Sequence, residues 1–266
     1  MILDGRAIAD ELYATLSERR KHIERPLTLG IIVSGHDPVI ESFVRIKKRA
    51  ADRLNIEMVR VDLPDSASNE DAIGAVRELA ERTDAVIVQL PLLNSLDTET
   101  VLAAIPDEKD VDAINLRVGE NEHTVVAPVA LAVFEMLQRG GIDPRGKRTV
   151  VVGAGRLVGA PSAALLRKLG ADVSILTRSQ GSMEDLKDAD IIVCGAGNPG
   201  FIKPEHIKDG VAIVDGGTSE SAGKLLGDAD PACAEKASVF TPVPGGVGPV
   251  AVAMIFKNLL DVVEKH

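Results

Sequence analysis

Short runs of β-branched and aliphatic residues alternate along the chain with longer segments whose apolar positions recur at helical spacing. In the first half this pattern predicts three buried strands, at residues 28–34, 56–62 and 84–88. Helices are predicted between them, at 38–54 and 69–80, since Pro38 suits a first helical turn and Ser68 with Asp71 forms a weak capping box. Strand, helix and strand in this order predict a parallel sheet with right-handed crossovers.

A stretch rich in proline and aspartate, residues 106–119, interrupts this alternation, and a helix is predicted after it at 128–140. A second alternating series then begins at residues 148–161. Its further strands are predicted at 172–177, 190–194 and 211–215. The last 18 residues, 249–266, have the apolar spacing of an amphipathic helix. The pattern predicts two α/β domains with parallel sheets and a boundary near residues 115–120.

Composition and charge exclude several classes of protein. The chain has 266 residues, 45% hydrophobic and 26% charged, which is typical of a globular protein and excludes disorder and a coiled coil as the main content. Forty acidic against thirty basic residues give a net charge of −10, and no basic face with interleaved aromatic residues is present for nucleic acid. Cys194 and Cys233 have no metal-binding spacing. No apolar run reaches the ~18 residues of a membrane span, and residues 1–12 read as a helix, so we expect a soluble, cytoplasmic protein.

A glycine-rich loop follows the first strand of the second series. Gly153, Ala154, Gly155 and Gly159 form a G-A-G-x-x-x-G pattern between an apolar strand and a predicted helix. Glycines there allow a tight turn and close approach of the backbone to a pyrophosphate, while the helix N-terminus supplies amides and partial positive charge. The strand before and the helix after favour a dinucleotide site. The alternative is that the glycines only make a tight strand–helix turn.

The end of the next strand indicates which dinucleotide would bind. NAD enzymes usually place an acidic residue there to bind the ribose hydroxyls. This sequence has Thr177, Arg178 and Ser179 instead, and a guanidinium with hydroxyls suits a 2′-phosphate. We therefore predict NADP as the cofactor, with Arg178 and Ser179 among its ligands. The alternative is that Arg178 is a solvated surface charge.

Five further segments together resemble one family. They are ILDG (2–5), FVRIKKRA (43–50), VQLPL (88–92), PDEKDVDA (106–113) and TPVPGGVGP (241–249). In this order and spacing the chain resembles the bifunctional methylenetetrahydrofolate dehydrogenase/methenyltetrahydrofolate cyclohydrolase family over essentially its whole length. The resemblance implies a folate-binding catalytic domain (1–118) and a Rossmann NADP-binding domain (119–266), with the last helix (249–266) returning to the catalytic domain. It also implies tetrahydrofolate derivatives as substrates, a homodimer and no metal.

The resemblance assigns roles to individual residues. It makes Lys47 the catalytic lysine, Gln89 its hydrogen-bonding neighbour and Asp112 the carboxylate that binds the pterin. From the residues alone, Lys47 would be one charge of a solvated helix face, and Asp112 a loop or capping residue. Further positions are assigned to folate (Phe43, Pro244, Gly245, Gly246 and Pro249) and, with the glycine loop, to the cofactor (Thr218).

The sequence departs from the family's pattern at several positions, most of them at the expected folate site. Phe43 stands in place of a tyrosine, Ala113 in place of a glycine, and VVAP (125–128) in place of Pro-Cys-Thr-Pro. Val250 and Ala251 replace Met-Thr, and Gly155 stands where serine is common. Two alternatives therefore stay open: a dehydrogenase of another small substrate, and a nucleotide-binding protein that has lost catalysis. Retention of Lys47, Gln89 and Asp112 together argues against the second.

Overall fold

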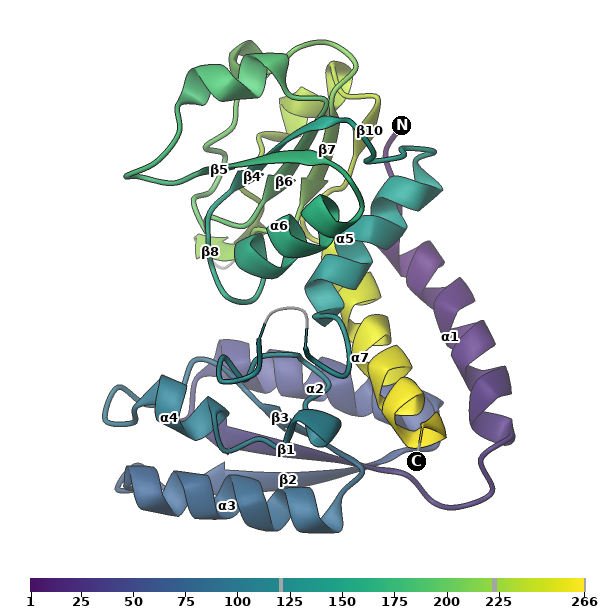
Figure 1. Cartoon of the computed structure of the whole chain (residues 1–266), viewed down its shortest axis with the longest axis vertical. Coiled ribbons are helices and arrows are strands. Elements are labelled where there is room, and N and C mark those ends of the chain that lie inside the picture. The colour runs from purple at the N-terminus through teal and green to yellow at the C-terminus, as the bar shows by residue number, and fades with distance from the viewer. Residues whose placement is uncertain (120–121, 222–223, 266) are drawn as a thin grey trace. The chain divides into compact units, whose positions relative to one another are not determined.

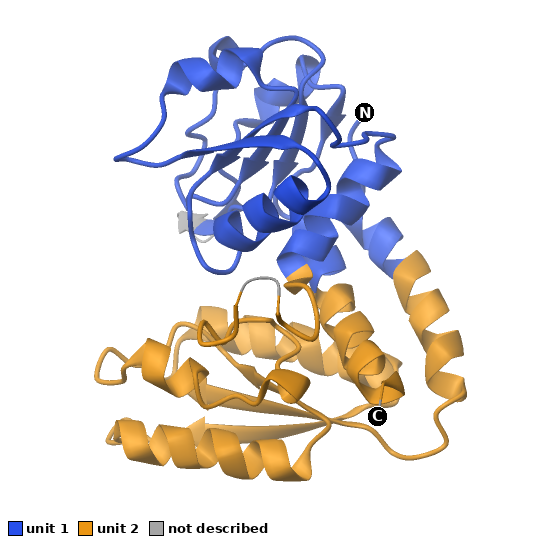
Figure 2. Ribbon diagram, in the orientation of Figure 1, with its two compact units in different colours: residues 1–10, 129–251 blue, residues 11–128, 252–266 orange. Residues whose placement is uncertain are grey.

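We describe the fold from a computed structural model of the chain, in which residues 1–119, 122–221 and 224–265 are described. The chain divides into two compact units (Figure 2). Unit 1 contains residues 1–10 and 129–251, and unit 2 contains residues 11–128 and 252–266. Two long helices contribute residues to both units, α1 (Gly5–Lys21) near the N-terminus and α7 (Val247–Glu264) at the C-terminus.

Unit 2 is built on a parallel sheet of three strands in the order β2-β1-β3 among the described residues. Its strands are β1 (Thr28–Ser34), β2 (Glu57–Leu63) and β3 (Ala85–Val88). Helix α3 lies along one face of the sheet and α2 along the other (Figure 1). The helices of this unit, besides the parts of α1 and α7, are α2 (Pro38–Arg53), α3 (Asn69–Arg82), the short α4 (Thr98–Leu102) and the 3₁₀ turn η1 (Asp107–Lys109).

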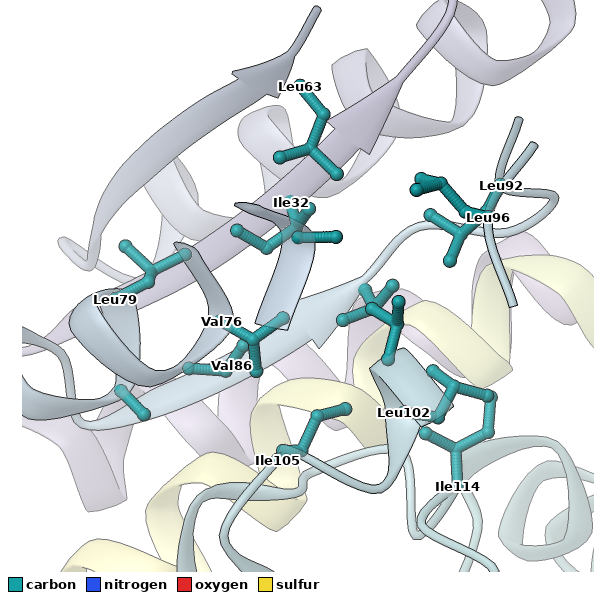
Figure 3. Close-up of a cluster of buried hydrophobic side chains, with 14 of the residues drawn as sticks. Ile32, Leu63, Val76, Leu79, Val86, Leu92, Leu96, Leu102, Ile105 and Ile114 are labelled. Carbon is teal, nitrogen blue, oxygen red and sulfur yellow. The ribbon is translucent and has the colours of Figure 1, made fainter. Parts of the chain in front are cut away.

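Buried aliphatic side chains from α3, the sheet and the segment after β3 form the core of unit 2 (Figure 3). Val76 and Leu79 of α3 pack against Ile32 and Val86 of the sheet, and all four are fully buried. Gly30 in β1 allows this close packing, because a β-carbon at residue 30 would lie 2.6 Å from Leu79 Cγ. Burial of this apolar surface is the main stabilising contribution to the unit.

Unit 1 contains a parallel sheet of five strands in the order β10-β7-β6-β4-β5 within the described ranges. The strands are β4 (Arg148–Val152), β5 (Asp172–Leu176), β6 (Ile191–Cys194), β7 (Ala212–Asp215) and β10 (Val239–Phe240). Its remaining elements are α5 (Pro128–Arg139), α6 (Gly159–Lys168), η2 (Met183–Asp188), η3 (Pro204–His206), η4 (Pro231–Glu235) and the antiparallel pair β8 (Ser219–Ser221) and β9 (Lys224–Leu226).

The strand order of unit 1 creates a switch point next to β4. The chain passes from β4 to β5 on one side and then to β6 on the other, so the loops that follow β4 and β6 diverge at the carboxyl edge of the sheet. Open α/β sheets bind their ligands in the crevice at such a point.

The N-terminus pairs with β10, the strand that lies beside β7. Leu3 N donates to Phe240 O (2.9 Å), and Phe240 N donates to Met1 O (2.9 Å).

Most predicted elements are present within one or two residues of their expected limits, and the predicted fold class is confirmed. The capping box of α3 is complete, because Ser68 Oγ accepts from Asp71 N and the Asp71 side chain accepts from Ser68 N. The last helix differs from the prediction of 249–266, because it begins at Val247, inside the glycine-rich segment, so Pro249 lies in its first turn and not in a loop. A proline lacks the N–H that a first helical turn leaves unpaired, so the turn tolerates it. Within the described ranges, no helix has the length and apolar character needed to cross a membrane.

Candidate active site

Lys47 and Gln89 meet in unit 2 although they are 42 residues apart in sequence. Lys47 lies on α2, and Gln89 directly follows β3. Lys47 Nζ donates a 2.7 Å hydrogen bond to Gln89 Oε1. Gln89 Nε2 donates a 2.8 Å bond to Leu90 O, which turns the amide so that its oxygen faces the lysine. Because Gln89 is buried, its two hydrogen bonds within the protein fix the orientation of its amide.

Lys47 differs from the other cations of α2 in its surroundings. Arg45, Lys48 and Arg49 are exposed, whereas Lys47 is half-buried. Burial lowers the pKa of Lys47, and the nearby Asp112 carboxylate only partly opposes this effect. The neutral amine is therefore reached at a lower pH than for an ordinary lysine. Lys47 is not one charge of a solvated helix face, so the geometry disfavours that alternative.

Asp112 faces the same site from the loop that follows η1. Its pKa is raised to about 6, chiefly by burial; the Lys47 ammonium lowers it and the Asp110 carboxylate raises it. The next residue, Ala113, has a φ of 49°, in the left-handed region that favours glycine. The turn therefore keeps the backbone shape that glycine would adopt without strain, although this sequence has alanine there.

Asp110 also belongs to this site, although its sequence pattern does not indicate such a role. It is buried, and its Oδ2 accepts bonds from the N–H groups of Ile114 (2.8 Å) and Asn115 (2.9 Å). These bonds close the turn that carries Asp112. Burial raises the pKa of Asp110. Asp110 and Asp112 are separated by one residue in a segment with four acidic residues, and nothing in the sequence indicates that Asp110 holds Asp112 in place.

Phe43 lies one helical turn before Lys47 on α2, and such residues share a helix face. Its side chain is partly exposed, so the ring is open to solvent beside the lysine. Phe43, Lys47, Gln89 and Asp112 thus form one group in unit 2.

The glycine loop of unit 1 follows β4 and leads into α6. Gly153 has a φ of 94°, and a β-carbon there would lie 2.5 Å from Gly195 O. A β-carbon on Gly159 would lie 2.1 Å from Gly153 O. Loop, helix and the segment after β6 are therefore packed closer than any side chain permits. This is the cradle that a dinucleotide pyrophosphate requires, so the residues present fit such a cofactor.

The other residues assigned to the cofactor also lie in unit 1. Thr177 N donates to Gln180 O (2.8 Å), and this turn after β5 leaves Arg178 and Ser179 exposed. Thr218 is exposed in the segment after β7. Ala154 and Gly155 are exposed in the glycine loop. All of these positions follow the carboxyl ends of strands, where parallel sheets bind ligands.

The glycine-rich segment at residues 241–249 contacts the start of the chain. Gly5 N donates a 2.9 Å bond to Gly245 O, and a β-carbon on Gly5 would lie 1.8 Å from Gly246 O. Pro244 is exposed, whereas Gly246 is buried. The segment ILDG (2–5) therefore has a structural role, because only a glycine at position 5 allows the backbone to lie this close to Gly246.

Comparison with known proteins identifies the family. Residues 3–112 match the family model "Tetrahydrofolate dehydrogenase/cyclohydrolase, catalytic domain", and residues 127–266 match "Tetrahydrofolate dehydrogenase/cyclohydrolase, NAD(P)-binding domain". The chain belongs to the tetrahydrofolate dehydrogenase/cyclohydrolase family.

Its relatives in this family cover its whole length. The "Bifunctional protein FolD" of Lacticaseibacillus casei is 37% identical over 99% of this chain and 98% of its own length. Among solved structures, the bifunctional FolD of Campylobacter jejuni has a TM-score of 0.93 and 29% identity, covering 100% of this chain and 99% of its own. FolD of Trypanosoma brucei, solved with NADP and an inhibitor, has a TM-score of 0.91 and 33% identity, covering 100% and 97%. The expected family is confirmed, and no comparison favours a dehydrogenase of another substrate.

Proposed function

We propose that this tetrahydrofolate dehydrogenase/cyclohydrolase oxidises 5,10-methylenetetrahydrofolate to the methenyl compound with NADP and then hydrolyses the product to 10-formyltetrahydrofolate. It is an oxidoreductase and a hydrolase of one-carbon metabolism. The observation that carries the residue roles is the half-buried Lys47, held by Gln89 at 2.7 Å and facing Asp112. Burial lowers the pKa of Lys47 although the Asp112 carboxylate opposes this effect, and a lysine perturbed in this way beside a second perturbed group is typical of a functional site.

The first reaction asks the protein mainly for positioning. The methylene carbon between two folate nitrogens gives up a hydride, and both nitrogens stabilise the methenyl cation that remains. When bound, NADP accepts this hydride on its nicotinamide ring. No proton moves in this step, so the protein needs no general base for it. Asp112 positions the substrate by accepting hydrogen bonds from the amino group and ring N–H of the pterin.

The second reaction requires proton transfer. Water adds to the methenyl cation, and a proton must leave as the ring opens. Lys47 is the base, because burial lowers its pKa and the cationic substrate lowers it further by repulsion. Gln89 holds the amine through its oxygen, and since an amide oxygen only accepts, it binds the ammonium and the amine alike.

A spectrophotometric assay tests this function. Purified protein with methylenetetrahydrofolate and NADP is expected to form the methenyl compound and then consume it, and hydrolysis of added methenyl compound is expected without cofactor. Formation without decay would leave only the dehydrogenase. Absence of both reactions in folded protein would contradict the proposed function.

The first prediction concerns the choice of cofactor. We expect NADP to be preferred over NAD by at least about tenfold in kcat/KM, equivalent to ~1.4 kcal/mol of transition-state discrimination. Arg178 after β5 supplies a cation, and no acidic residue lies there to bind the ribose hydroxyls. Arg178→Ala is expected to remove most of the preference. The glycine loop contains a second cation, Arg156, and Arg156→Ala is the comparison variant.

Equal or better use of NAD by the wild type would contradict this preference. If NADP is preferred but Arg178→Ala leaves the ratio unchanged while Arg156→Ala lowers it, the preference stands and Arg156 is its source.

The second prediction concerns the hydroxyl missing at Phe43. Placement of the ring matters for hydride transfer, whereas a phenol could join the proton-transfer network around Lys47. Phe43→Tyr is therefore expected to raise hydrolysis of the methenyl compound relative to its formation, measured as the ratio of the two rates. Val39→Tyr, at a similarly exposed position one turn earlier on α2, is the control. A ratio that stays the same or falls for Phe43→Tyr would make position 43 a packing site.

The third prediction concerns pH. The pKa of Asp112 is about 6, so its carboxylate is largely ionised at pH 7 and becomes protonated as the pH falls below 6. Affinity for a tetrahydrofolate analogue is therefore expected to be constant above pH 7 and to fall about tenfold per pH unit well below 6, measured by calorimetry. Asp112→Asn is expected to bind weakly with no such step. A wild-type profile without a step between pH 5 and 7 would contradict the role of Asp112.

Three further properties complete the proposal: the protein is a cytoplasmic homodimer, and its product supplies purine biosynthesis. The resemblance to the family supports all three. Sedimentation at several concentrations tests the homodimer, and a purine requirement in cells that lack the protein tests the metabolic role.

A further inference from the structure

The loop that follows β6 in unit 1 is exposed to solvent and is hydrogen-bonded to a buried carboxylate. Residues 196–199 are exposed, and the loop begins where β6 ends at the carboxyl edge of the sheet. Behind the loop lies Asp228, which is fully buried. Burial of a charged side chain is unfavourable unless hydrogen-bond partners compensate for it. The hydrogen bonds of Asp228 therefore indicate its role.

Asp228 accepts hydrogen bonds from three consecutive N–H groups of this loop. Its Oδ2 accepts from Ala196 N at 2.6 Å and Gly197 N at 3.2 Å, and its Oδ1 accepts from Asn198 N at 2.7 Å. Both oxygens of the carboxylate are therefore used to shape one loop. Gly217 packs against the same group, since a β-carbon there would lie 2.4 Å from Asp228 Cγ.

Asp228 is itself fixed in place by the neighbouring strand. Asp215, the last residue of β7, accepts from Gly217 N (2.9 Å) and from Ala229 N (2.8 Å), so it holds the backbone on both sides of the contact. Ile202 N also donates to Asp228 O (3.0 Å). Asp215 and Asp228, with the backbone N–H groups that they accept from, therefore link the ends of β6 and β7, and we call this hydrogen-bonded group the brace.

This brace lies on the side of the switch point that the nicotinamide half of a dinucleotide would reach. The turn after β5 is where the adenosine ribose is bound in such sheets, and the glycine loop after β4 takes the pyrophosphate. The chain order continues with β6 on the other side of β4. The loop after β6 also contacts the glycine loop, because a β-carbon on Gly153 would lie 2.5 Å from Gly195 O.

We propose that Asp228 is a positioning residue for hydride transfer, which holds loop 196–198 as a preformed wall for the nicotinamide half of NADP. This inference rests on the proposed function and adds a residue and a loop to it. Asp228 does not touch the cofactor; it acts through the backbone of Ala196, Gly197 and Asn198.

The test uses the variant Asp228→Asn. Asparagine keeps the shape but offers one accepting oxygen, and its amino group would face an N–H donor of the loop. The matched control is Asp230→Asn, two residues away, whose carboxylate contacts Ala232 N and Lys203 Nζ and not the loop. Three kinds of measurement are made. Dehydrogenase activity gives kcat and KM, a second assay follows cofactor-free hydrolysis of the methenyl compound, and calorimetry measures binding of NADP and of adenosine 2′,5′-bisphosphate.

For Asp228→Asn we expect dehydrogenase kcat to fall about 10- to 100-fold, because displacement of a reacting ring by about 1 Å has an effect of that size. Hydrolysis and binding of the bisphosphate are expected to stay within about twofold of the wild type, as are all properties of Asp230→Asn. A merely structural role in unit 1 would instead lower bisphosphate binding together with dehydrogenase activity, and that result would overturn the proposal. Unchanged dehydrogenase activity in folded Asp228→Asn would also overturn it.

A second variant covers the case in which Asp228→Asn does not fold. Gly197→Ala changes the same loop from its exposed side, where φ is 67° and alanine is strained. It is expected to lower dehydrogenase kcat and leave hydrolysis unchanged, and normal kcat would contradict the assigned loop. If wild-type protein oxidises no methylenetetrahydrofolate, the proposed function fails. Binding then tests the loop alone: Asp228→Asn should weaken NADP binding but not bisphosphate binding, and equal weakening of both overturns the inference.

Discussion

Replacement of Lys47 by methionine is expected to lower the cyclohydrolase activity by about 10²- to 10⁴-fold, the usual contribution of a proton-transfer group. Methionine keeps much of the volume of the stem and removes the amine that Gln89 Oε1 now holds at 2.7 Å. Hydride transfer moves no proton, so the dehydrogenase should keep a measurable fraction of its rate. The variant should therefore accumulate the methenyl compound, seen as a persistent absorbance where the wild type shows a transient one.

Lys48→Met is the matched control for this variant. Lys48 is the next residue of α2, is exposed, and forms an ion pair with Asp52 one turn later. Surface pairs of this kind contribute little, so both activities of Lys48→Met should equal those of the wild type. If Lys47→Met behaves like Lys48→Met, Lys47 is only a charge of the helix. If Lys47→Met loses both activities while it stays folded, Lys47 positions the substrate, and its role as the base is wrong.

The strands and long helices of this chain could be predicted because each is specified locally. Strand β3 is a continuous apolar run, and β1 and β7 are rich in β-branched and aliphatic residues. Helices α2 and α3 carry their starting signals in Pro38 and in the pair Ser68 and Asp71. Strand β10, two residues long, could not be predicted in this way. It exists because β7 lies beside it and because the N-terminus pairs with it, and the pairing with the N-terminus joins residues more than 200 positions apart.

In the candidate site, too, local features can be predicted from the sequence, and contacts between distant residues cannot. The glycine loop was predicted from its own residues, since glycine spacing and the flanking strand and helix are local properties. The meeting of Lys47 with Gln89 was not, because the sheet brings α2 and the end of β3 together over 42 residues. The resemblance supplied that pair. The sequence does not indicate Asp110 or Asp228, because their carboxylates accept from backbone N–H groups, which every residue type except proline provides.

A single methyl group at Gly159 is expected to lower NADP affinity by about 10²-fold or more, since the loop and the helix must shift apart to make room for it. In Gly159→Ala the new β-carbon would lie 2.1 Å from Gly153 O and 2.7 Å from Gly153 C. Both are backbone atoms, so no side chain can rotate away, and α6 must move from β4 together with its N-terminal amides. Affinity is measured by calorimetry, and the melting temperature is expected to fall.

Gly155→Ala is the control because it adds the same atom to the same loop. There the nearest atom to the new β-carbon is Gly195 O at 3.8 Å, an ordinary contact, and Gly155 lacks the left-handed φ of Gly153. NADP affinity of Gly155→Ala should stay within about threefold of the wild type. Hydrolysis of the methenyl compound should survive in both variants, since Lys47, Gln89 and Asp112 all belong to unit 2. If Gly159→Ala binds NADP as tightly as Gly155→Ala does, close packing of α6 on the loop is not what forms the dinucleotide site.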